Sequence, residues 1–570
     1  MTPELAIRGG LLVDGSGGAP YRADLGIAGG RIVTIEPTVR ADDEIDAGGR
    51  IVAPGFIDIH THYDPQVVWD PMLTPSCWHG VTSVVAGNCG YSIAPTRAAQ
   101  RATLLRTLDK VEDMRVRTLE AGLAWTFETY PEYLAAIEAR GCGVNFGGYV
   151  GHTPVRLYVL GDEAYERPAT DDELAAMRRV VAASIQGGAL GFSTDRAGFH
   201  LGDGGRPVPS IVATQDEVES LMLVIGEIGQ GTVHVAPGEN YRWVYDVQRR
   251  IGRRINWSSI LTYPAAAASS RADYRDKLAD HERERAAGAD VWVQVTCRPI
   301  AQEISMLEPT GFYTMPAFSE LVALPHDQRA RLYADRGWRV RAGADIARTG
   351  LLATRWGSMP VTESATHPEL LGRTLADIAA ARGCDPWDVL CDLAVDDELR
   401  TRFTITFAND DVDGVTALLR GEGCIIGLSD AGAHVGQICD AVLPTDFLAH
   451  WVRDREVMSV ECGVRKLTGE LADVIGIDRG YLRVGAPADV VVLELDRLSP
   501  GPIRRVHDMP AAGERLIADA PAGLEAVLVN GTPIRRDGAP TDDRLDRLPG
   551  QILRSTPAPR SRENTTREQR

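Results

Sequence analysis

Eight short apolar segments, separated by mostly helical sequence, fill the middle of this chain and limit its fold more than any other feature. Their apolar character is nearly continuous, as in strands that are buried on both faces of a parallel sheet. A connecting stretch such as DELAAMRRVVAASIQGG (172–188) has helical periodicity and ends in glycine. Eight strand–helix units predict an α/β fold, a (β/α)₈ TIM barrel. The predicted strands are 56–62, 81–89, 145–152, 189–194, 232–237, 255–263, 291–297 and 424–430.

The stretch between the seventh and eighth predicted strands is too long for an ordinary loop. About 125 residues lie between them, whereas βα connections usually have only a few residues. They include helical stretches at 319–337 and a strand-like piece, FTITF, at 403–407. We predict an insertion around 298–423 at the rim of the barrel. The sequence leaves two roles open for it, a lid over the catalytic face or structural elaboration.

Both ends of the chain differ from this central repeat. Residues 1–50 alternate apolar and small residues with glycine between them, and similar sequence returns at 488–496 and 526–538. This pattern indicates short strands joined by turns. The final residues, 546–570, are polar with scattered proline, and we expect a flexible tail there, either disordered or lightly docked as an arm.

Charge and cysteine content exclude several classes of partner. The chain of 570 residues has a formal net charge of −19 and a pI near 5.2, which argues against binding to nucleic acid or to an anionic membrane. No apolar run is long enough for a membrane span. Nine scattered cysteines without a CxxC pair, and an N-terminus without the pattern of a signal peptide, predict a cytoplasmic protein.

Three motifs at predicted strand ends carry chemistry. In PGFIDIHTHYD (54–64), His60 and His62 are two residues apart on one strand, so both side chains face the same side. Cys89, in GNCG after the second strand, is either a small core residue or a soft metal ligand. Asp430, in GLSDAGAH, ends the last strand, and barrel closure should bring it beside His60. A helix N-cap is the alternative role for this aspartate.

These segments resemble the metal-dependent amidohydrolase superfamily, and within it the N-acyl-D-amino-acid deacylase (D-aminoacylase) branch. The resemblance implies a barrel, here residues 56–479, together with a small β-sandwich domain built from both chain ends, here 1–55 and 480–545. The matching segments occur in the family's order and span nearly the whole chain. They are PGFIDIHTHYD, GVTSVVAGNCGYSIAP, GHTPVRLYVLG, GALGFSTD, GLSDAGAHVG and the late APADVVVLELD and VLVNG.

The resemblance also implies a ligand set for one or two divalent ions, with Zn²⁺ favoured by histidine and cysteine donors. His60, His62 and Cys89 match metal ligands of the branch, and Asp430 matches its catalytic aspartate, which also contacts the metal. The cysteine takes the place that a carboxylated lysine has in other amidohydrolases, and ALGFSTD (189–195) contains no lysine.

Strands five and six depart from the branch, which normally supplies a histidine from each. Ser259 stands where the strand-six histidine is expected, and Ala236 stands at the expected position on strand five. His234 lies two residues before Ala236 and therefore faces the same side of the strand. Two roles remain open for His234, a replacement metal ligand or a hydrogen-bonded core histidine.

Four further side chains are candidates for substrate binding. His152 and Arg156 form GHxxxR at the end of strand three, where an arginine fork suits a substrate carboxylate, with an ordinary ion pair as the alternative. Ser193 either bonds substrate or satisfies strand-end amides. His434 either contacts substrate or lies on a helix surface.

The sequence therefore predicts a hydrolase that cleaves a C–N amide bond of an N-acyl amino acid or a similar small-molecule amide. Metal-activated water is the nucleophile, and Asp430 serves as general base and then general acid. Two alternatives remain open: a cyclic amide substrate such as a hydantoin, lactam or diketopiperazine, and a metal-free homologue without catalytic activity. Formation of a homo-oligomer is also left open.

Overall fold

An eight-stranded parallel barrel forms the centre of the protein in its computed structural model. The strands pair in the order β8-β9-β10-β11-β12-β13-β14-β18, and a parallel bridge between Thr61 and Ala431 closes the ring. The predicted (β/α)₈ TIM barrel is confirmed. The barrel strands are β8 (Phe56–Asp58), β9 (Val81–Ala86), β10 (Asn145–Gly151), β11 (Gly191–Asp195), β12 (Thr232–Ala236), β13 (Ile255–Ser258), β14 (Val291–Val295) and β18 (Cys424–Ile426). The structure describes residues 2–198, 200–263, 273–309, 312, 315–321, 324–349, 355–541 and 547–555.

Several strands end earlier than the apolar runs predicted. The run at 56–62 contains a strand only to Asp58, and the run at 424–430 contains one only to Ile426. Beyond these points the backbone leaves the ladder and forms the loops at the carboxyl face. Apolar side chains continue into these loops because the loops are buried, so hydrophobicity alone does not mark the strand ends.

Helices surround the barrel, as the alternating pattern predicts. The predicted helix at 172–188 corresponds to α5, which begins with a capping box between Thr170 and Glu173. The helices outside the insertion are α1 (Arg101–Val111), α2 (Val116–Gly122), α3 (Tyr130–Arg140), α4 (His152–Leu160), α5 (Asp171–Gln186), α6 (Pro209–Val212), α7 (Gln215–Ile228), α8 (Trp243–Ile251), α9 (Tyr274–Ala286), α15 (Val412–Arg420), α16 (Leu443–Asp446), α17 (Val460–Leu467) and α18 (Gly469–Ile475). None of the described helices is both long and apolar enough to cross a membrane.

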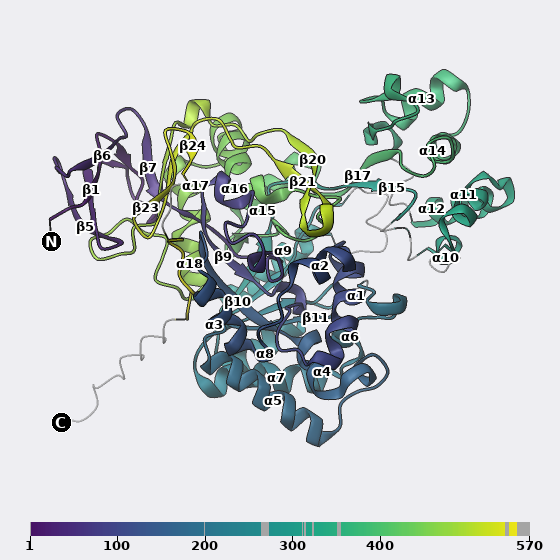
Figure 1. Ribbon diagram of the computed structural model, residues 1–570, viewed down its shortest axis with the longest axis horizontal. Coiled ribbons are helices and arrows are strands. Elements are labelled where there is room, and N and C mark those ends of the chain that lie inside the picture. The colour runs from purple at the N-terminus through teal and green to yellow at the C-terminus, as the bar shows by residue number, and fades with distance from the viewer. Residues whose placement is uncertain are drawn as a thin grey trace.

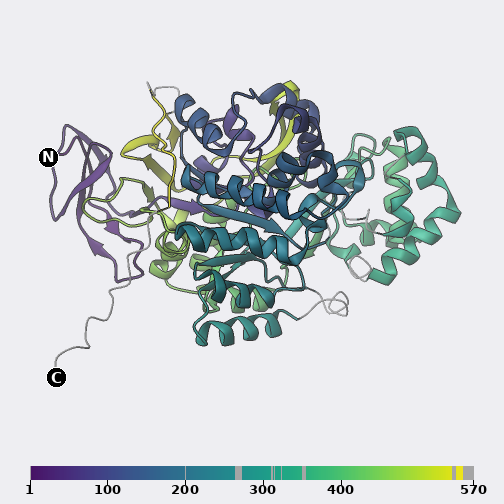
Figure 2. The same cartoon turned by 90° about the horizontal axis from the view of Figure 1, so that it is seen from below.

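The long stretch after β14 forms a separate layer with its own apolar core, which includes Phe318, Trp338 and Trp387. Figures 1 and 2 show it beyond the carboxyl ends of the strands, on the side of the barrel opposite the N-terminal strands. Its antiparallel sheet has the order β15-β17-β16. The elements are β15 (Ile300–Ser305), β16 (Val361–Glu363), β17 (Arg402–Ala408), α10 (Pro316–Ser319), α11 (His326–Ala334), α12 (Arg336–Thr349), α13 (Leu375–Arg382) and α14 (Pro386–Asp396).

Within this insertion both local predictions are confirmed. The strand-like FTITF lies inside β17. The helical stretches predicted at 319–337 correspond to α11 and the start of α12, which are separated at Asp335. The parts of the insertion at 310–311, 313–314, 322–323 and 350–354 lie outside the described residues.

Strands from both chain ends pair beside the amino ends of the barrel strands. In a seven-stranded sheet of order β24-β23-β22-β19-β7-β2-β3, β7 (Ile51–Pro54) pairs with β19 (Val490–Leu493). A four-stranded sheet of order β5-β4-β1-β6 packs on it, and Ile7 and Val490 share the core between them. The other strands are β1 (Leu5–Arg8), β2 (Leu11–Leu12), β3 (Tyr21–Arg22), β4 (Asp24–Ala28), β5 (Arg31–Glu36), β6 (Asp43–Asp46), β22 (Leu524–Val529), β23 (Thr532–Arg536) and β24 (Ala539–Pro540).

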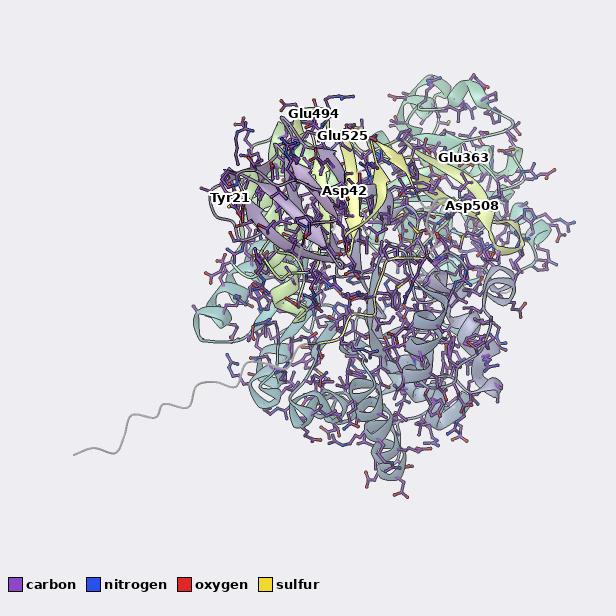
Figure 3. The ribbon with its side chains drawn as sticks, turned by 60° about the vertical axis from the view of Figure 1, so that its left-hand side comes forward. Tyr21, Asp42, Glu363, Glu494, Asp508 and Glu525 are labelled. Carbon is purple, nitrogen blue, oxygen red and sulfur yellow. The ribbon has the colours of Figure 1, made fainter. Side chains whose placement is uncertain are left out.

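A hairpin of β20 (Ile503–Met509) and β21 (Gly513–Ala518) reaches from this region to the insertion. Figure 3 labels Asp508 on the hairpin and Glu363 on β16 at the flank where the two meet. Arg505 joins them, because its guanidinium lies 2.7 Å from Glu303 and 2.8 Å from Glu363. The same group donates to the carbonyl oxygen of Gly436, in the loop that follows the last barrel strand.

The described part of the C-terminal tail is a docked arm, one of the two alternatives that its composition leaves open. Residues 547–555 dock against the barrel, where Ile552 bridges to Phe146 and the amide of Leu553 donates to the Phe146 carbonyl. Leu553 is buried in the core at the amino ends of the strands. One apolar side chain with backbone pairing therefore orders a polar stretch. Residues 546 and 556–570 of the expected tail lie outside the described residues.

Candidate metal centre

His60 and His62 leave the end of β8 on the same side, as their spacing predicts. Thr61 between them pairs with the last strand, and this pairing fixes the backbone from which both rings project. Their ring centroids are 5.6 Å apart, and both side chains are buried. The two imidazoles therefore converge on one point at the carboxyl face of the barrel.

Cys89 lies in a tight turn that only glycine permits on either side. Gly87 and Gly90 both have positive φ, and a Cβ on Gly87 would lie 2.2 Å from the carbonyl oxygen of Tyr149. The turn places Cys89 Sγ 3.4 Å from His60 Nε2 and 4.0 Å from His234 Nε2. The GNCG motif thus delivers the sulfur to the histidines.

His234, in the middle of β12, is part of the same cluster. Its ring is perpendicular to that of His60, with centroids 5.1 Å apart. Together with His60 and Cys89 it forms one group of side chains whose ligand atoms all lie within 4.8 Å of one another. The geometry favours the ligand role for this histidine over the role of a core residue.

Asp430 completes a second group with His60 and His62. Its Oδ1 lies 3.1 Å from His60 Nε2 and 3.8 Å from His62 Nε2, and its side chain is 27% exposed. The alternative role as a helix N-cap is wrong, since no helix starts here in the described chain and the next helical turn begins at Asp440. Instead Asp430 has a φ of 45°, a left-handed conformation that aims the carboxylate inward.

The donor set fits a divalent transition metal. Imidazole nitrogens, one thiol sulfur and one carboxylate oxygen are the ligands that Zn²⁺ takes in proteins. Burial lowers the pKa of His62 to about 3, so this ring is neutral and has a lone pair for a metal. Burial also raises the pKa of the Cys89 thiol well above its ordinary value, so a bound cation is needed to keep the sulfur ionised.

Buried carboxyl groups around the cluster lack compensating side chains. Asp58, Asp64 and Glu112 form no ion pair with lysine or arginine within the described residues. Burial raises the pKa of Asp58 to about 6 and of Asp64 to about 7, and raises that of Glu112 well above its usual range. Asp430 differs: burial opposes its ionisation, but the charge and hydrogen bond of His60 outweigh this and lower its pKa. A divalent cation would offset this concentration of acidic groups.

Three residues that the sequence analysis missed face the Nδ1 atoms of the three histidines, two of them through hydrogen bonds. His60 Nδ1 lies 2.6 Å from Gln294 Oε1, and His234 Nδ1 lies 2.8 Å from Asn256 Oδ1. His62 Nδ1 lies 3.2 Å from Glu112 Oε1. Gln294 and Asn256 were visible as polar residues inside apolar strands, but Glu112 follows α1 without any local signal.

His152 and Arg156 occupy a separate cluster on α4. The Arg156 guanidinium lies 2.5 and 2.6 Å from the two carboxylate oxygens of Glu217 on α7, and His152 Nε2 lies 3.1 Å from the same group. His152 Nδ1 also pairs with Thr194. Arg156 is fully buried. One terminal nitrogen of Arg156 makes both contacts with Glu217, and the other donates to the carbonyl oxygens of Ala164 and Arg167. The ion-pair alternative describes this pair, and we correct the substrate-binding assignment because both terminal nitrogens are already occupied.

Ser193 and His434 differ in what they face. The Ser193 hydroxyl donates to the Gly87 carbonyl and accepts from the Gly90 amide at 3.1 Å, so it clamps the Cys89 turn as its strand-end alternative requires. His434 has a φ of 46° and lies in an irregular loop, so its assignment to a helix surface is wrong. Its buried Nδ1 has no hydrogen-bond partner among the described residues, and it remains a candidate for substrate contact.

Known proteins share both the sequence and the fold. A family model described as the amidohydrolase family matches residues 43–535. The N-acyl-D-glutamate deacylase of Alcaligenes xylosoxydans xylosoxydans is 32% identical over 97% of this chain and 96% of that protein. The crystal structure of the N-acyl-D-glutamate deacylase of Bordetella bronchiseptica, complexed with zinc and a phosphonate inhibitor that mimics the tetrahedral intermediate, is similar with a TM-score of 0.67. It is 28% identical and covers 97% of this chain and 100% of that one. A D-aminoacylase structure, described for its binuclear metal centre, has a TM-score of 0.66 and 25% identity, covering 97% and 99% of the two chains.

Proposed function

The chain belongs to the amidohydrolase family, and on that premise we propose that it is a zinc-dependent deacylase of N-acyl-D-amino acids. The observation that carries this proposal is the convergence of two ligand groups that share His60 and draw on strands from opposite ends of the barrel sequence. Similar proteins named as N-acyl-D-amino-acid deacylases support the substrate class. The product pair is a carboxylate and a free amino acid.

The side chains divide the work of amide hydrolysis. A bound divalent cation supplies Lewis acidity, which lowers the pKa of water toward about 7 and polarises a carbonyl oxygen. Asp430 is ionised because its pKa is low, and it accepts the proton from the attacking water. The same carboxyl group then returns this proton to the departing nitrogen as the C–N bond breaks. Asp430 Oδ1 lies 3.1 Å from His60 Nε2, so the proton acceptor stands beside an atom that would bind the cation.

The two ligand groups compete for one nitrogen. His60 Nε2 has a single lone pair, so it completes only one group at a time. We propose one ion with a full set of side-chain ligands, and any second ion would rely on the side chains that remain. The residues expected to hold metal are His60, His62, Cys89, His234 and Asp430. His434 is our candidate for substrate contact at the rim.

We also propose a cytoplasmic location. No disulfide joins any two cysteines in the described part of the chain, as expected in a reducing compartment.

The substrate proposal is tested with the zinc-loaded protein and a panel of amides. The panel contains both enantiomers of N-acetylated amino acids together with a hydantoin, a lactam and a diketopiperazine. We expect turnover of linear N-acyl-D-amino acids. Turnover confined to the cyclic compounds would establish the cyclic-amide alternative, and no activity together with no bound zinc would leave the metal-free homologue.

The ligand role of His234 is tested by His234→Ala, with zinc content and zinc affinity measured by competition with a chelator. His281→Ala is the matched control, because His281 is equally buried but pairs with Tyr245, away from the cluster. We expect zinc binding to weaken only in His234→Ala. Unchanged affinity in that variant would make His234 a core residue.

A further inference from the structure

The three histidines of the metal centre share one orientation. In each ring Nε2 is the atom that approaches the other ligands, in the contacts His60–Asp430, His62–Asp430 and His234–Cys89. In each ring Nδ1 faces a side-chain oxygen instead. An oxygen acceptor at Nδ1 requires a proton there, which leaves the lone pair on Nε2. The surrounding side chains therefore set the tautomer that a metal needs.

The acceptors of His60 and His234 are neutral amides joined in a chain. Gln294 Nε2 donates to Asn256 Oδ1 at 2.8 Å, and Asn256 Nδ2 donates to the Tyr149 hydroxyl at 3.2 Å. Asn256 Nδ2 also donates to the Val233 carbonyl at 3.3 Å, and a carbonyl can only accept, so Asn256 Oδ1 and in turn Gln294 Oε1 are left to accept from the rings. Strand β13 lacks the histidine expected of its family and contributes Asn256 in this way.

The side chain that faces Nδ1 of His62 is a carboxyl group, that of Glu112, whose Oε1 lies 3.2 Å away. This residue ends α1, is 2% exposed, and forms no ion pair with a lysine or arginine within the described residues. Its backbone carbonyl accepts the amide of His434, in the loop that also carries Asp430. Glu112 therefore contacts the first-strand ligand through its side chain and the last-strand loop through its backbone.

We propose that Glu112 is a positioning residue for the metal, acting through His62. Its Oε1 lies 3.2 Å from Nδ1 of His62. Once a bound divalent cation keeps this carboxyl group ionised, it fixes the Nδ1-protonated tautomer and raises the electron density at Nε2 more than an amide does, so His62 becomes the strongest imidazole donor of the three. The inference rests on the proposed zinc-dependent function. A carboxylate behind a ligating histidine is worth about 10–100-fold in metal affinity.

Glu112→Gln tests this proposal. It replaces the carboxyl group beside His62 by an amide, the group that His60 and His234 already face. We expect the zinc dissociation constant, measured by chelator competition, to rise about tenfold or more. At saturating zinc kcat should stay within a few fold, because Glu112 does not reach the substrate side of His62. The melting temperature of the metal-free protein should be unchanged or higher, because a buried acid without a cation partner is removed.

Asp64→Asn is the matched control. Asp64 is equally buried and lines the same small cavity as His62 and Glu112, but its carboxylate accepts from the Gly87 amide and has no hydrogen bond or ion pair with a histidine among the described residues. Unchanged zinc affinity in Glu112→Gln would overturn the inference, as would an equal loss in both variants, which would indicate a general effect of negative charge. A fall in the melting temperature of metal-free Glu112→Gln would also overturn it, because Glu112 would then be a structural residue. A wild-type protein that binds no zinc would instead refute the proposed function.

Discussion

Two groups of buried polar side chains lie at the carboxyl ends of the barrel strands, and they balance their charge differently. In the cluster on α4 and α7, the Glu217 carboxylate meets the Arg156 guanidinium and His152 directly. Around His60 and His62, buried carboxyl groups gather without any lysine or arginine partner in the described chain. The first group is complete as it stands, whereas the second is completed by a cation. An arginine or a histidine at a strand end therefore indicates a binding site only when no side chain of opposite charge already pairs with it.

Asp430→Asn removes the proton acceptor from the second group and has the largest expected effect. We expect kcat for an N-acyl-D-amino acid to fall by about 10²–10⁴-fold, the usual contribution of general acid–base catalysis. Zinc content should stay normal, because His60, His62 and Cys89 remain. A variant with near-normal turnover would remove Asp430 from the mechanism, and loss of zinc would make it chiefly a ligand.

Glu217→Gln removes the counter-charge from the first group. We expect the free energy of unfolding to fall by about 3–5 kcal/mol, because Arg156 is left buried without a carboxylate. Denaturant titration at neutral pH measures this, and kcat of the folded variant should be unchanged. Glu219→Gln is the control on the same helix, since Glu219 pairs with the exposed Arg250 and should cost at most about 1 kcal/mol. If Glu217→Gln is fully folded but has lost turnover, His152 and Arg156 would have a role in the active site after all.

The loss of stability at acid pH should show the contribution of the ion pair between Glu217 and Arg156. Burial opposes ionisation of Glu217, but His152 and Arg156 outweigh it and lower its pKa from the ordinary 4.5 to about 2. A carboxyl group whose pKa is lower in the folded state stabilises the fold above the unfolded pKa. This contribution is lost as pH falls from 4.5 to about 2. Unfolding titrations across this window should show a shallower decline in Glu217→Gln, and equal slopes would contradict the pairing.

Ser193→Ala has the smallest expected effect. It tests the strand end that lies between the metal centre and the cluster on α4 and α7. Ser193 clamps the Cys89 turn, and its neighbour Thr194 pairs with His152. Loss of the hydroxyl leaves a buried amide and a buried carbonyl unpaired, at about 1–3 kcal/mol of stability. We expect zinc affinity to weaken a few fold. Ser184→Ala, whose hydroxyl bonds only within α5, should leave zinc affinity unchanged. An equal result in both variants would separate Ser193 from the metal centre.

The sequence was sufficient for the barrel and for the strand-end motifs. Apolar runs with helical spacers locate all eight strands, and an HxH pair on one strand with Asp430 on the last predicts their meeting once the barrel closes. These predictions succeed because the alternation of side chains along a strand and the order of strands in a barrel both follow directly from the sequence.

The partners of these residues were not predictable in the same way. Glu217 lies 61 residues beyond Arg156, and Glu112 lies 50 residues beyond His62, with no periodicity that links either pair. Their pairing depends on how helices pack on the barrel. The depth of His234 in the barrel likewise depends on strand register, which places it opposite Ser193 and level with the Cys89 turn. The alternation of side chains along a strand shows which face a residue lies on, but not how deep in the barrel it lies.

The docked C-terminal segment also sets the order in which the molecule can be finished. Residues 547–555 are made after every barrel strand, yet Leu553 packs with side chains that were made hundreds of residues earlier, and one edge of β7 gains its partner only when β19 has been made. Until then the nascent barrel exposes apolar surface and an open strand edge, which are features that favour aggregation. A premature stop before residue 553 would therefore harm the whole barrel and not only the residues it removes.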